Sequence, residues 1–529
     1  MEDLHDPYLM DGVREAVERI ERAQKSGELI WIYGDYDVDG TTSTALLLHY
    51  LREFGCNVDY FITDRFSEGY GLTRSGLLEA AEAGAGLIIS VDMGTTSVDA
   101  TRYAGEIGLD VIICDHHEPS DELPDVYALL NPIKPGCSYP FKSLCAGGVT
   151  FKLVQAMCTS RGVPEKALDY LDFVAVASAS DMVPLVGENR TMVYFGLQRL
   201  NETPRPGFKG MFECSNIEVG TICSSTIVYN LAPRLNAAGR LGDARKAVEL
   251  LLTENDIQAF RLAQELESKN HQRRVIDEKI FHEASAIADD LINKQNYRSL
   301  VLHDPNWHVG VINIVASRLV EKFHKPTIML TTVDNVTKGS ARSIKNFDIH
   351  QALHRCSHLL KQFGGHKYAA GLSLDAANVP ELRDLFDEVA RTTITDDMLI
   401  PEQQIDTELN LNELSPAFVE LLQRFSPFGY QNFKPTFVSH NVHMVRRAKI
   451  VGKNHVKFRV RQGNFLIDAI GFNLGDRLSM LNSGKPISII YTIEESMHRN
   501  SKHLQLYVKD LRPTDLIDIP AQSNGRKSA

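Results

Sequence analysis

The sequence predicts an α/β protein of several domains: a parallel-sheet domain, a long connecting helix, a second α/β domain and a C-terminal OB-like β-barrel. Three observations support this prediction. Short apolar runs alternate with helical patterns over roughly the first 200 residues, and a charge-rich stretch with few helix breakers follows. Alternating polar and apolar residues then dominate from about residue 435. The length of 529 residues gives room for about two to four domains.

The N-terminal sheet is predicted from four apolar runs that are too short and too continuous to be surface helices. These runs are Leu29–Tyr33, Val58–Ile62, Leu87–Val91 and Val111–Cys114. Between them lie helical patterns at Thr41–Phe54, Gly76–Ala83 and Ser97–Gly105. Such alternation is typical of βαβ units, in which helices cover both faces of a parallel sheet. We expect this domain to span residues 1–205.

The remaining chain divides according to its local pattern. Residues 206–294 are expected to be a connecting region, in which Thr253–Lys294 forms one or two long helices. Residues 295–395 are expected to form the second α/β domain, with strands at Ser299–His303 and Thr327–Leu330, a helix at Val311–Phe323 and a glycine-rich end at Gly364–Gly371. A linker over 396–434, a barrel over 435–513 and a flexible tail over 514–529 follow, because about five short strands in some 80 residues suit an OB-fold.

The composition excludes several classes of protein. Hydrophobic residues make up 43% and charged residues 23% of the chain, as in ordinary globular proteins. No apolar run approaches the ~20 residues that span a bilayer, and the acidic N-terminus lacks the apolar segment of a secretion signal. Eight cysteines without a CxxC pair indicate reduced thiols. We therefore expect a cytoplasmic protein without a membrane partner.

The net charge of −12 is unevenly distributed along the chain. Residues 435–512 contain 13 Lys and Arg against five Asp and Glu, a local balance of +8, which leaves −20 for the rest. A basic module attached to an acidic body is typical of a nucleic-acid-binding appendage. A solvated basic surface without a partner is the alternative that charge alone leaves open.

Acidic residues and a histidine pair follow several of the apolar runs. They are Asp35, Asp37 and Asp39 in GDYDVDG, Asp92 in SVDMG, Asp115, His116 and His117 in DHH, and Asp181 in SASDMVP. Asp181 follows a further small apolar run, which we expect to be a fourth acidic strand end. Because the carboxyl ends of parallel strands meet at one edge of a sheet, we expect these side chains to converge in one crevice. Any single aspartate is more simply a loop solubiliser or a helix cap. The combined pattern favours a site.

Six neighbouring carboxylates would repel one another strongly, and bound divalent cations would remove that conflict. Oxygen ligands with one or two imidazoles, and no cysteine at ligand-like spacing, favour Mn²⁺ or Mg²⁺ over a thiolate zinc site. Two metal ions held by shared carboxylates suit the hydrolysis of a phosphate ester or anhydride.

The motifs GDYDVDG, SVDMG, DHH and SDMVPL, in this order and spacing, resemble the four motifs of the DHH phosphoesterases. The resemblance extends over nearly the whole chain through segments such as DRFSEGYGL, LAPRLNAAGRLGDA, WHVGVINIVASRL and GGHKYAAGLSL. Within the family, the chain is similar to the single-strand-specific 5′→3′ DNA exonucleases. The resemblance implies a DHH catalytic domain, a DHH-associated domain and an OB-fold that binds nucleic acid.

The resemblance also implies roles for individual residues. Two metal ions, Mn²⁺ or Mg²⁺, would be bound by Asp37, Asp39, Asp92, His116 and Asp181, with Asp92 as the bridge. His117 would lie near the scissile phosphate, and Arg240 would contact that phosphate. Asp35 and Asp115 would not contact the substrate but would orient the residues that do. The substrate's 5′ end would be bound by Arg65, Tyr70, Ser340 and Arg342, with His366 from the glycine motif nearby.

Two features depart from the family pattern. Many members carry a histidine four residues before the second aspartate of the first motif, whereas this chain has Tyr33, so one metal ion is expected to have fewer protein ligands. The chain also begins close to its first strand, without the longer N-terminal extension of many relatives.

These observations predict a metal-dependent exonuclease that hydrolyses single-stranded DNA from the 5′ end to 5′-mononucleotides in recombination and repair. Its partners would be single-stranded DNA, a helicase and a single-strand-binding protein, and it would act as a monomer. One alternative is a phosphodiesterase of short RNA or cyclic dinucleotides, and another is a non-catalytic scaffold. Phe458, Phe465, Phe472 and Tyr507 in the barrel could stack on bases, although alternating aromatics in a barrel more often form its core.

Overall fold

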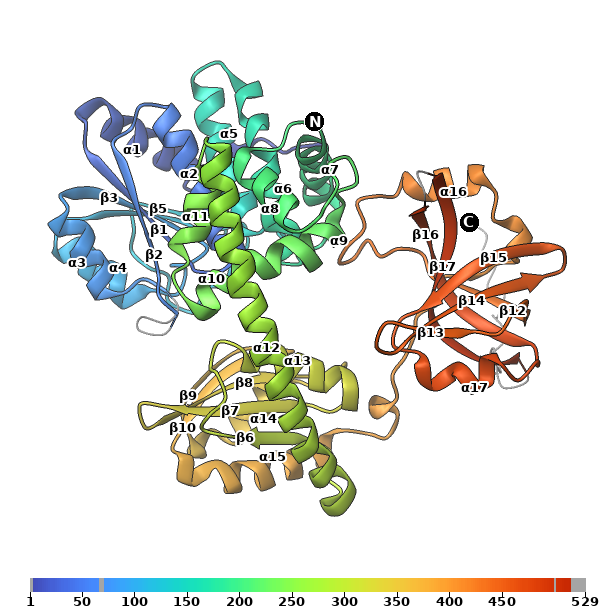
Figure 1. Ribbon diagram of the computed structural model, residues 1–529. Helices are drawn as coiled ribbons and strands as arrows, with labels where there is room; N and C mark the ends of the chain where they lie inside the picture. The colour runs from blue at the N-terminus through green and yellow to red at the C-terminus, as the bar shows by residue number, and fades with distance from the viewer. Residues whose placement is uncertain (1–2, 66–70, 499–500, 515–529) are drawn as a thin grey trace, which may run out of the picture. The chain divides into compact units, whose positions relative to one another are not determined.

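The computed structural model describes residues 3–65, 71–498 and 501–514, with side chains omitted at 496–498 and 501–502. The chain divides into two compact units. Unit 1 contains Met1–Pro401 and Gly429–Gln431, and unit 2 contains Glu402–Phe428 and Asn432–Ala529. Unit 1 contains two sheets, each with its own helices, which we call the first lobe and the second lobe; the long helix α12 runs from one to the other (Figure 1).

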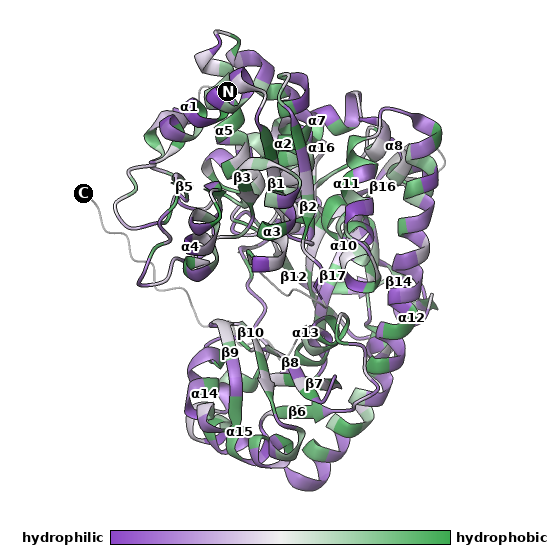
Figure 2. Cartoon of the chain, turned by 90° about the vertical axis from the view of Figure 1, so that its left-hand side faces the viewer, coloured by the Kyte–Doolittle hydropathy of each residue, from purple (hydrophilic) through white to green (hydrophobic). Residues whose placement is uncertain are grey.

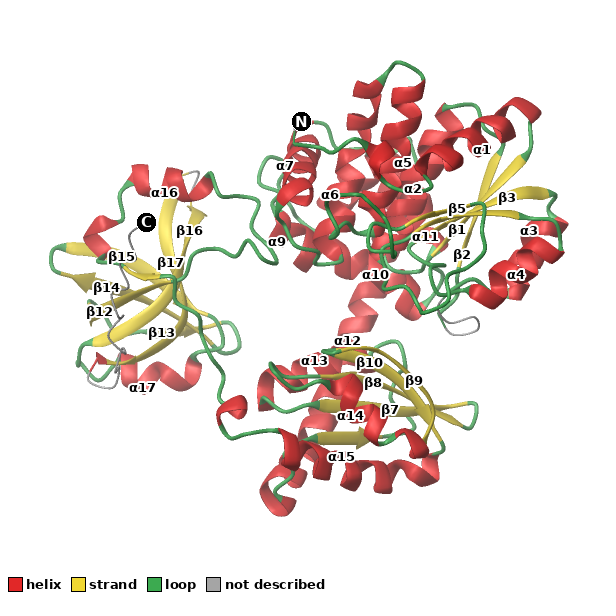
Figure 3. Ribbon diagram, turned by 180° about the vertical axis from the view of Figure 1, so that it is seen from behind, coloured by secondary structure: helices red, strands yellow, loops and turns green. Residues whose placement is uncertain are grey.

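The first lobe is built on the predicted parallel sheet, whose strand order is β2-β1-β3-β4-β5. Its strands are β1 (Leu29–Gly34), β2 (Val58–Ile62), β3 (Ala85–Val91), β4 (Asp110–Cys114) and β5 (Ala128–Leu130), and every neighbouring pair is parallel. Helices flank the sheet on both sides (Figure 3). Ile30 and Ile32 enter the core beneath α1 (Val13–Ser26) and α2 (Val38–Glu53), whereas Trp31 and Tyr33 enter the core beneath α3 (Arg74–Glu82) and α4 (Val98–Glu106). Burial on both faces explains why these strands are continuous apolar runs.

A layer of helices completes the first lobe. It comprises α5 (Ala146–Ser160), α6 (Leu171–Ser180), α7 (Gly187–Glu202), α8 (Pro206–Cys214), α9 (Ser224–Thr226), α10 (Ala232–Leu241) and α11 (Arg245–Leu252). The apolar run before Asp181 is therefore the helix α6 and not a strand, which corrects the expectation of a fourth acidic strand end. Nine of its ten residues are buried, and a short helix that is buried on nearly all sides cannot be distinguished from a buried strand by periodicity.

The stretch 253–294 forms one helix, α12 (Asp256–Gln295), of 40 residues. At about 1.5 Å per residue it is about 60 Å long. Asn255 caps its start by accepting a hydrogen bond from Gln258 N, and Asn296 ends it in the left-handed conformation. Leu262 and Leu266 pack in the core of the first lobe, whereas Ile280 and Leu291 pack in a core of the second. One helix thus contributes to a core in each lobe. Hydrophobic and hydrophilic residues alternate along its length (Figure 2).

The second lobe contains a mixed sheet of order β6-β7-β8-β10-β9. Its strands are β6 (Leu300–His303), β7 (Thr327–Val333), β8 (Val336–Arg342), β9 (Leu360–His366) and β10 (Ala369–Leu374); β6 and β7 are parallel and the other pairs antiparallel. Helices α13 (Ile312–Phe323), α14 (Ile349–Arg355) and α15 (Val379–Thr393) pack with it. The predicted glycine-rich end is the β9–β10 hairpin. There a Cβ on Gly365 would lie 2.4 Å from the backbone oxygen of Ala369.

Unit 2 contains the predicted barrel. Its strands are β11 (Thr407–Glu408), β12 (Phe437–Met444), β13 (Lys449–Val451), β14 (His455–Gln462), β15 (Phe465–Gly471), β16 (Ile487–His498) and β17 (Ser501–Pro513), with helices α16 (Pro416–Gln423) and α17 (Leu478–Leu481). Pairing runs β12-β16-β17-β15-β14 and returns from β14 to β12, which closes a five-stranded barrel.

The stretch expected as a linker, 396–434, contributes to this unit, because β11 pairs with β12 and Leu409, Leu411 and Leu414 lie in the barrel core. Of the expected tail, residues 515–529 lie outside the described residues. Within the described residues, no helix has both the length and the apolar character to cross a bilayer.

Candidate metal centre

Three aspartates follow β1: Asp35 and Asp37 lie in a tight turn, and Asp39 lies at the start of α2. A Cβ on Gly40 would lie 2.6 Å from the backbone oxygen of Asp35, so this turn requires glycine. Asp37 is the N-cap of α2 and accepts a hydrogen bond from Gly40 N at 3.1 Å. Asp39, in the first turn of α2, accepts hydrogen bonds from the backbone N–H groups of Ala146 and Gly147, both at 2.8 Å. The start of α5 therefore orients the Asp39 carboxylate and stabilises its charge.

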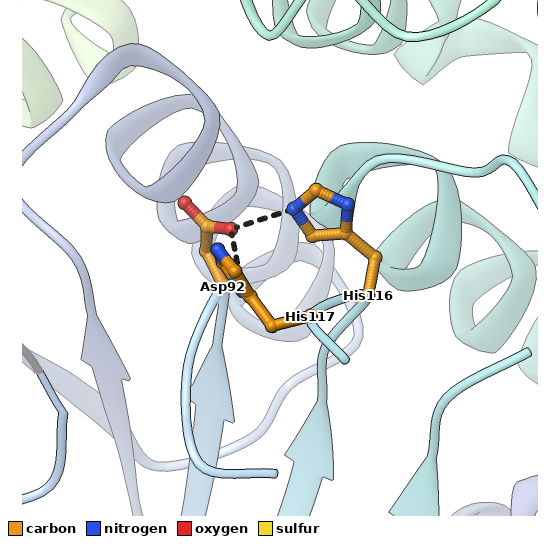
Figure 4. A group of neighbouring side chains, drawn as sticks. All are labelled: Asp92, His116 and His117. Carbon is orange, nitrogen blue, oxygen red and sulfur yellow. Dashed lines mark ion pairs between the residues drawn. The ribbon is translucent and has the colours of Figure 1, made fainter. Parts of the chain in front are cut away.

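Asp92 follows β3 in the left-handed conformation, with φ of 65°. A non-glycine residue adopts this conformation at an energetic cost, and such residues cluster at functional sites. Only 2% of Asp92 is exposed. Its carboxylate faces the rings of His116 and His117, which follow β4 (Figure 4).

His116 directs its Nε2 toward three carboxylates. This atom lies 3.3 Å from Oδ1 of Asp92, 3.7 Å from Oδ2 of Asp39 and 3.7 Å from Oδ2 of Asp181. These separations are longer than good hydrogen bonds but suit ligands that surround one ion. Burial, followed by the charge of His117, lowers the pKa of His116 to about 4, so its ring is neutral and Nε2 can offer a lone pair.

Ligand atoms of the predicted metal residues gather in three overlapping groups. The atoms within each group lie within 4.8 Å of one another, and the groups are Asp92-His116-His117, Asp39-His116-Asp181 and Asp35-Asp37-Asp92. The structure therefore brings together all five predicted ligands, with Asp35 and His117 beside them. Asp92 and His116 each belong to two groups. The two oxygens of the Asp92 carboxylate could serve neighbouring ions, whereas Nε2 of His116 could bind one ion.

The carboxylates of this cluster raise one another's pKa. Burial and then the charge of Asp37 raise the pKa of Asp35 to about 8 and that of Asp39 to about 6. Burial and then neighbouring aspartates also raise the pKa of Asp92 and of Asp181. Divalent cations would offset this repulsion, and the donor set of carboxylate oxygens and imidazole nitrogen fits Mn²⁺ or Mg²⁺.

Asp115 is hydrogen-bonded to the ring of His117 and orients it. Its Oδ1 lies 2.7 Å from Nδ1 of His117, and it accepts hydrogen bonds from the backbone N–H groups of Thr95 and His116. Burial alone would lower the pKa of His117, but the hydrogen bond and charge of Asp115 raise that pKa to about 9. The His117 ring is therefore fixed in orientation and readily holds a proton.

Several arginines lie near the acidic cluster. The guanidinium of Arg65 lies 4.2 Å from the ring centroid of Tyr36. Tyr36 stands between Asp35 and Asp37 in the sequence. Arg240, near the end of α10, has a pKa lowered to about 9 by burial and then by the charges of Arg65, Arg273 and Arg342, whereas Asp37 acts in the opposite direction. Like charges held this close suit the binding of a phosphate.

Models of three domain families match the chain: the DHH family, N-terminal domain over 29–178, the DHHA1 domain over 285–392 and the RecJ OB domain over 405–510. The single-stranded-DNA-specific exonuclease RecJ of Bacillus subtilis is 40% identical over 511 residues, which cover 96% of this chain and 64% of that protein. RecJ of Escherichia coli is 34% identical over 526 residues, covering 95% of this chain and 91% of its relative. The chain belongs to the RecJ family.

Solved structures agree with this assignment. RecJ of Thermus thermophilus in complex with Mn²⁺ superposes with a TM-score of 0.82 at 29% identity, covering 95% of this chain and 72% of that one. The same RecJ has been solved with Mg²⁺. This chain thus spans less than two thirds of the B. subtilis RecJ and most of the E. coli one.

The predicted 5′-end residues of this RecJ-family chain come from both lobes of unit 1. Arg65 follows β2, whereas Ser340 and Arg342 lie on β8, where Nη1 of Arg342 donates to Oγ of Ser340 at 3.0 Å. His366 is exposed at the end of β9, and no contact between it and the metal cluster occurs among the described residues. Tyr70 lies outside the described residues.

Tyr33, which stands where many family members have histidine, serves the packing of the first lobe. It is fully buried, and its hydroxyl lies 2.9 Å from Oγ1 of Thr73, the N-cap of α3. The phenol therefore points into the α3 face of the sheet.

The sequence patterns missed Asn131. This fully buried residue follows β5, and its Nδ2 donates to the backbone oxygen of His117 at 2.9 Å and to Oγ1 of Thr95 at 3.0 Å. Its signal was a polar residue after a fifth apolar run, Ala128–Leu130, which is too short to stand out. Asn131 thus joins the loops that carry Asp92 and the histidine pair.

Proposed function

We propose that this chain is a metal-dependent exonuclease that hydrolyses phosphodiester bonds of single-stranded DNA in the 5′→3′ direction and releases 5′-mononucleotides, in DNA recombination and repair. The observation that carries the proposal is the convergence of acidic side chains, paired histidines and arginines on a chain of the RecJ family. The 5′→3′ direction and the 5′-mononucleotide product follow from the proposed position, beside the metal cluster, of the residues that bind the substrate's 5′ end.

The metal ligands in this proposal are Asp37, Asp39, Asp92, His116 and Asp181. The ions are Mn²⁺ or Mg²⁺, in agreement with the donor set and with the ions bound to the T. thermophilus RecJ. When bound, two such ions activate a water as nucleophile and neutralise charge on the phosphate and the leaving oxygen.

The side chains around the ions orient the substrate and move its protons. Arg240 binds the scissile phosphate, because a guanidinium presents paired donors to phosphate oxygens. His117, held by Asp115, donates a proton from Nε2 to the phosphate or to the leaving oxygen. Arg65, Ser340 and Arg342 bind the 5′ end from two lobes, so the first phosphodiester bond is placed at the ions.

The barrel of unit 2 supplies further contacts with the strand. Phe458 is buried in the barrel core and Phe465 packs against it, so these two aromatics are structural. Phe472 is 47% exposed and packs edge-to-face on Tyr507, with ring centroids 5.4 Å apart. Lys457 is exposed and shares a cross-strand row with Tyr507, through Ile470. An aromatic pair with one exposed ring, Phe472, and one half-buried ring, Tyr507, beside a cation suits base stacking with attraction to the backbone.

Family membership favours DNA over the alternative of short RNA or cyclic dinucleotides. The intact cluster of ligands argues against a non-catalytic scaffold, since six neighbouring carboxylates serve no packing role. Rates of hydrolysis of a single-stranded DNA, the matching RNA and a cyclic dinucleotide, each with Mn²⁺, test the choice. DNA is expected to be cleaved at least tenfold faster than either competitor. Faster cleavage of a cyclic dinucleotide, unchanged by deletion from about residue 430, would favour the alternative.

We further propose that the enzyme acts in the cytoplasm as a monomer and works with a helicase and a single-strand-binding protein. An enzyme that needs a free single strand depends on another protein to open the duplex. Light scattering during size-exclusion chromatography is expected to give a mass near 59.1 kDa. Degradation of a blunt duplex is expected only when a helicase and ATP are added.

A further inference from the structure

Arg240 is held by neutral acceptors of the second lobe. Its Nη1 donates to the backbone oxygen of Gly310 at 3.0 Å and to Oδ1 of Asn313 at 2.6 Å. Gly310 precedes α13, and Asn313 lies in the first turn of that helix. Arginine can only donate, so the amide oxygen of Asn313 must face it.

Several other partly or fully buried arginines in unit 1 are paired with carboxylates: Arg19 with Glu28, Arg205 with Asp172, Arg234 with Glu267 and Arg318 with Asp277. Arg240 instead resembles Arg342, which donates to the neutral oxygens of Ser340 and Ala341. No ion pair of Arg240 occurs among the residues that the structure describes. Its positive charge is therefore fixed in place by neutral oxygens, and Asp37 acts on it only through its charge.

The edge of the Arg240 guanidinium that carries Nε and Nη2 remains available for a phosphate. Both hydrogens of Nη1 are used by Gly310 and Asn313. Nε and Nη2, which lie along the other edge, have no acceptor within the described part of the chain. These two nitrogens form the parallel pair of donors that binds two phosphate oxygens at once.

The acceptors themselves sit on a rigid segment. A Cβ on Gly310 would lie 2.5 Å from the backbone oxygen of Arg240, so the two backbones are in direct contact. Trp307 is buried and its Nε1 donates to Glu283 at 3.0 Å, and its backbone oxygen accepts from Thr331 at 2.7 Å. A site residue is placed accurately only when its supporting shell is fixed in this way.

We propose that Asn313 is a positioning residue for Arg240: its neutral amide orients the guanidinium across the two lobes while leaving the positive charge for the scissile phosphate. The proposal rests on the proposed phosphate-binding role of Arg240. It explains why an amide, and not a carboxylate, stands at this position. A carboxylate would accept the same hydrogen bond but would also neutralise the arginine.

The test compares Asn313→Ala, Asn313→Asp and Ser317→Ala in the full chain with Mn²⁺ and 5′-phosphorylated single-stranded DNA. Ser317 is a matched control, because it lies one turn further along α13 and, among the described residues, its hydroxyl bonds only to the backbone oxygen of Asn313. Asn313→Ala is expected to lower kcat about 10–100-fold, the usual loss when an orienting partner is removed. Ser317→Ala is expected to match the wild type.

Asn313→Asp separates a positioning role from a structural one. The aspartate keeps the hydrogen-bond acceptor and the size of the side chain. If Asn313 only stabilises the fold, Asn313→Asp should therefore be as active as the wild type. The proposal instead expects KM to rise about tenfold. It also expects the slope of log KM against log salt to fall by about 0.7, the loss of one phosphate contact on a single strand. This variant retains the packing if Asn313→Ala fails to fold. Wild-type KM and salt slope for Asn313→Asp would overturn the proposal.

A double-mutant cycle distinguishes this inference from the proposed function. Arg240→Ala is expected to abolish most activity, and adding Asn313→Ala to it is expected to cause no further loss. If Arg240→Ala leaves activity unchanged, the proposed role of Arg240 fails. If Arg240→Ala is inactive but Asn313→Ala matches the wild type, the present inference alone fails.

Discussion

Oδ1 of Asp115 lies 2.7 Å from Nδ1 of His117, and the same carboxylate accepts backbone hydrogen bonds from Thr95 and His116. These partners come from the loops after β3 and β4. Asp115 therefore fixes both the histidine ring and the loop that carries Asp92. Burial alone would raise the pKa of Asp115, but the hydrogen bond and the charge of His117 hold that pKa well below its usual range, so the carboxylate remains charged.

The first prediction concerns this support. Asp115→Asn keeps the shape of the side chain but removes its charge, so the pKa of His117 falls and its ring loses its fixed orientation. We expect kcat to drop about 10–100-fold with little change in melting temperature. Steady-state kinetics with Mn²⁺ checks this, with the exposed Asp121→Asn as control. Equal kcat values for the two variants would refute a supporting role.

The second prediction concerns the shared ligand. Asp92 belongs to two of the three metal groups, so Asp92→Asn is expected to reduce the number of Mn²⁺ ions bound per chain and to lower kcat at least 10³-fold. Titration calorimetry or electron paramagnetic resonance counts the ions. Asp99→Asn is the control, because Asp99 is exposed on α4 and pairs only with Arg102 among the described residues. Unchanged Mn²⁺ stoichiometry in Asp92→Asn would exclude Asp92 as a ligand.

The third prediction concerns the pH dependence of stability without metal. The pKa of Asp35 is raised to about 8 and that of Asp39 to about 6, against about 3.9 in an unfolded chain. The folded state thus binds these protons more tightly, and their stabilising contribution is lost as pH rises from about 4 to 8.

In EDTA, Asp35→Asn is therefore expected to melt at a higher temperature than the wild type at pH 9 and at a similar temperature at pH 5. Added Mn²⁺ should raise the melting temperature of the wild type more at the higher pH, because ions and protons compete for the same carboxylates. Scanning fluorimetry across this pH range measures both effects. The raised pKa of Asp35 would be contradicted if the difference in melting temperature between the wild type and Asp35→Asn in EDTA were the same at pH 5 and pH 9.

The fourth prediction concerns the start of α5. A Cβ on Gly147 would lie 2.5 Å from Cβ of Ala177 and 3.3 Å from Oδ1 of Asp39, so Gly147→Ala should push the helix away from that carboxylate. We expect the Kd for Mn²⁺ to rise about tenfold. Gly105→Ala is the matched control, since no atom lies within 4 Å of its added Cβ. Identical Mn²⁺ affinities in the two variants would show that this contact is unimportant.

The fifth prediction concerns the barrel. In an Asp92→Ala background, which prevents cleavage, Tyr507→Ala and Phe472→Ala are each expected to weaken binding of single-stranded DNA at least fivefold, because each removes a stacking surface. Fluorescence anisotropy measures the affinity. Leu466→Ala provides the control, because Leu466 is similarly exposed on β15 but aliphatic. Equal losses in all three variants would argue against stacking.

Sequence patterns predicted the part of the structure that local rules control. The strands β1 to β4 lie within one or two residues of the apolar runs, and the acidic residues after β1, β3 and β4 converge as expected. The prediction that the fourth acidic element is a strand is wrong, because nine of the ten residues of α6 are buried and the run shows no amphipathic helical period. Asn131 and Asn313 make contacts that are distant in sequence, with Thr95 and Arg240, and local patterns do not predict such contacts.

We propose above all that the cluster around Asp92 cleaves single-stranded DNA from its 5′ end. The most direct measurement follows single strands labelled at the 5′ or the 3′ end, with Mn²⁺, for the wild type and for an Asp92→Ala, His116→Ala double variant. We predict that the wild type releases the 5′ label first, as a mononucleotide, and that chelation of Mn²⁺ or the double variant abolishes release. Early release of the 3′ label, or persistent cleavage by the double variant, would contradict the account.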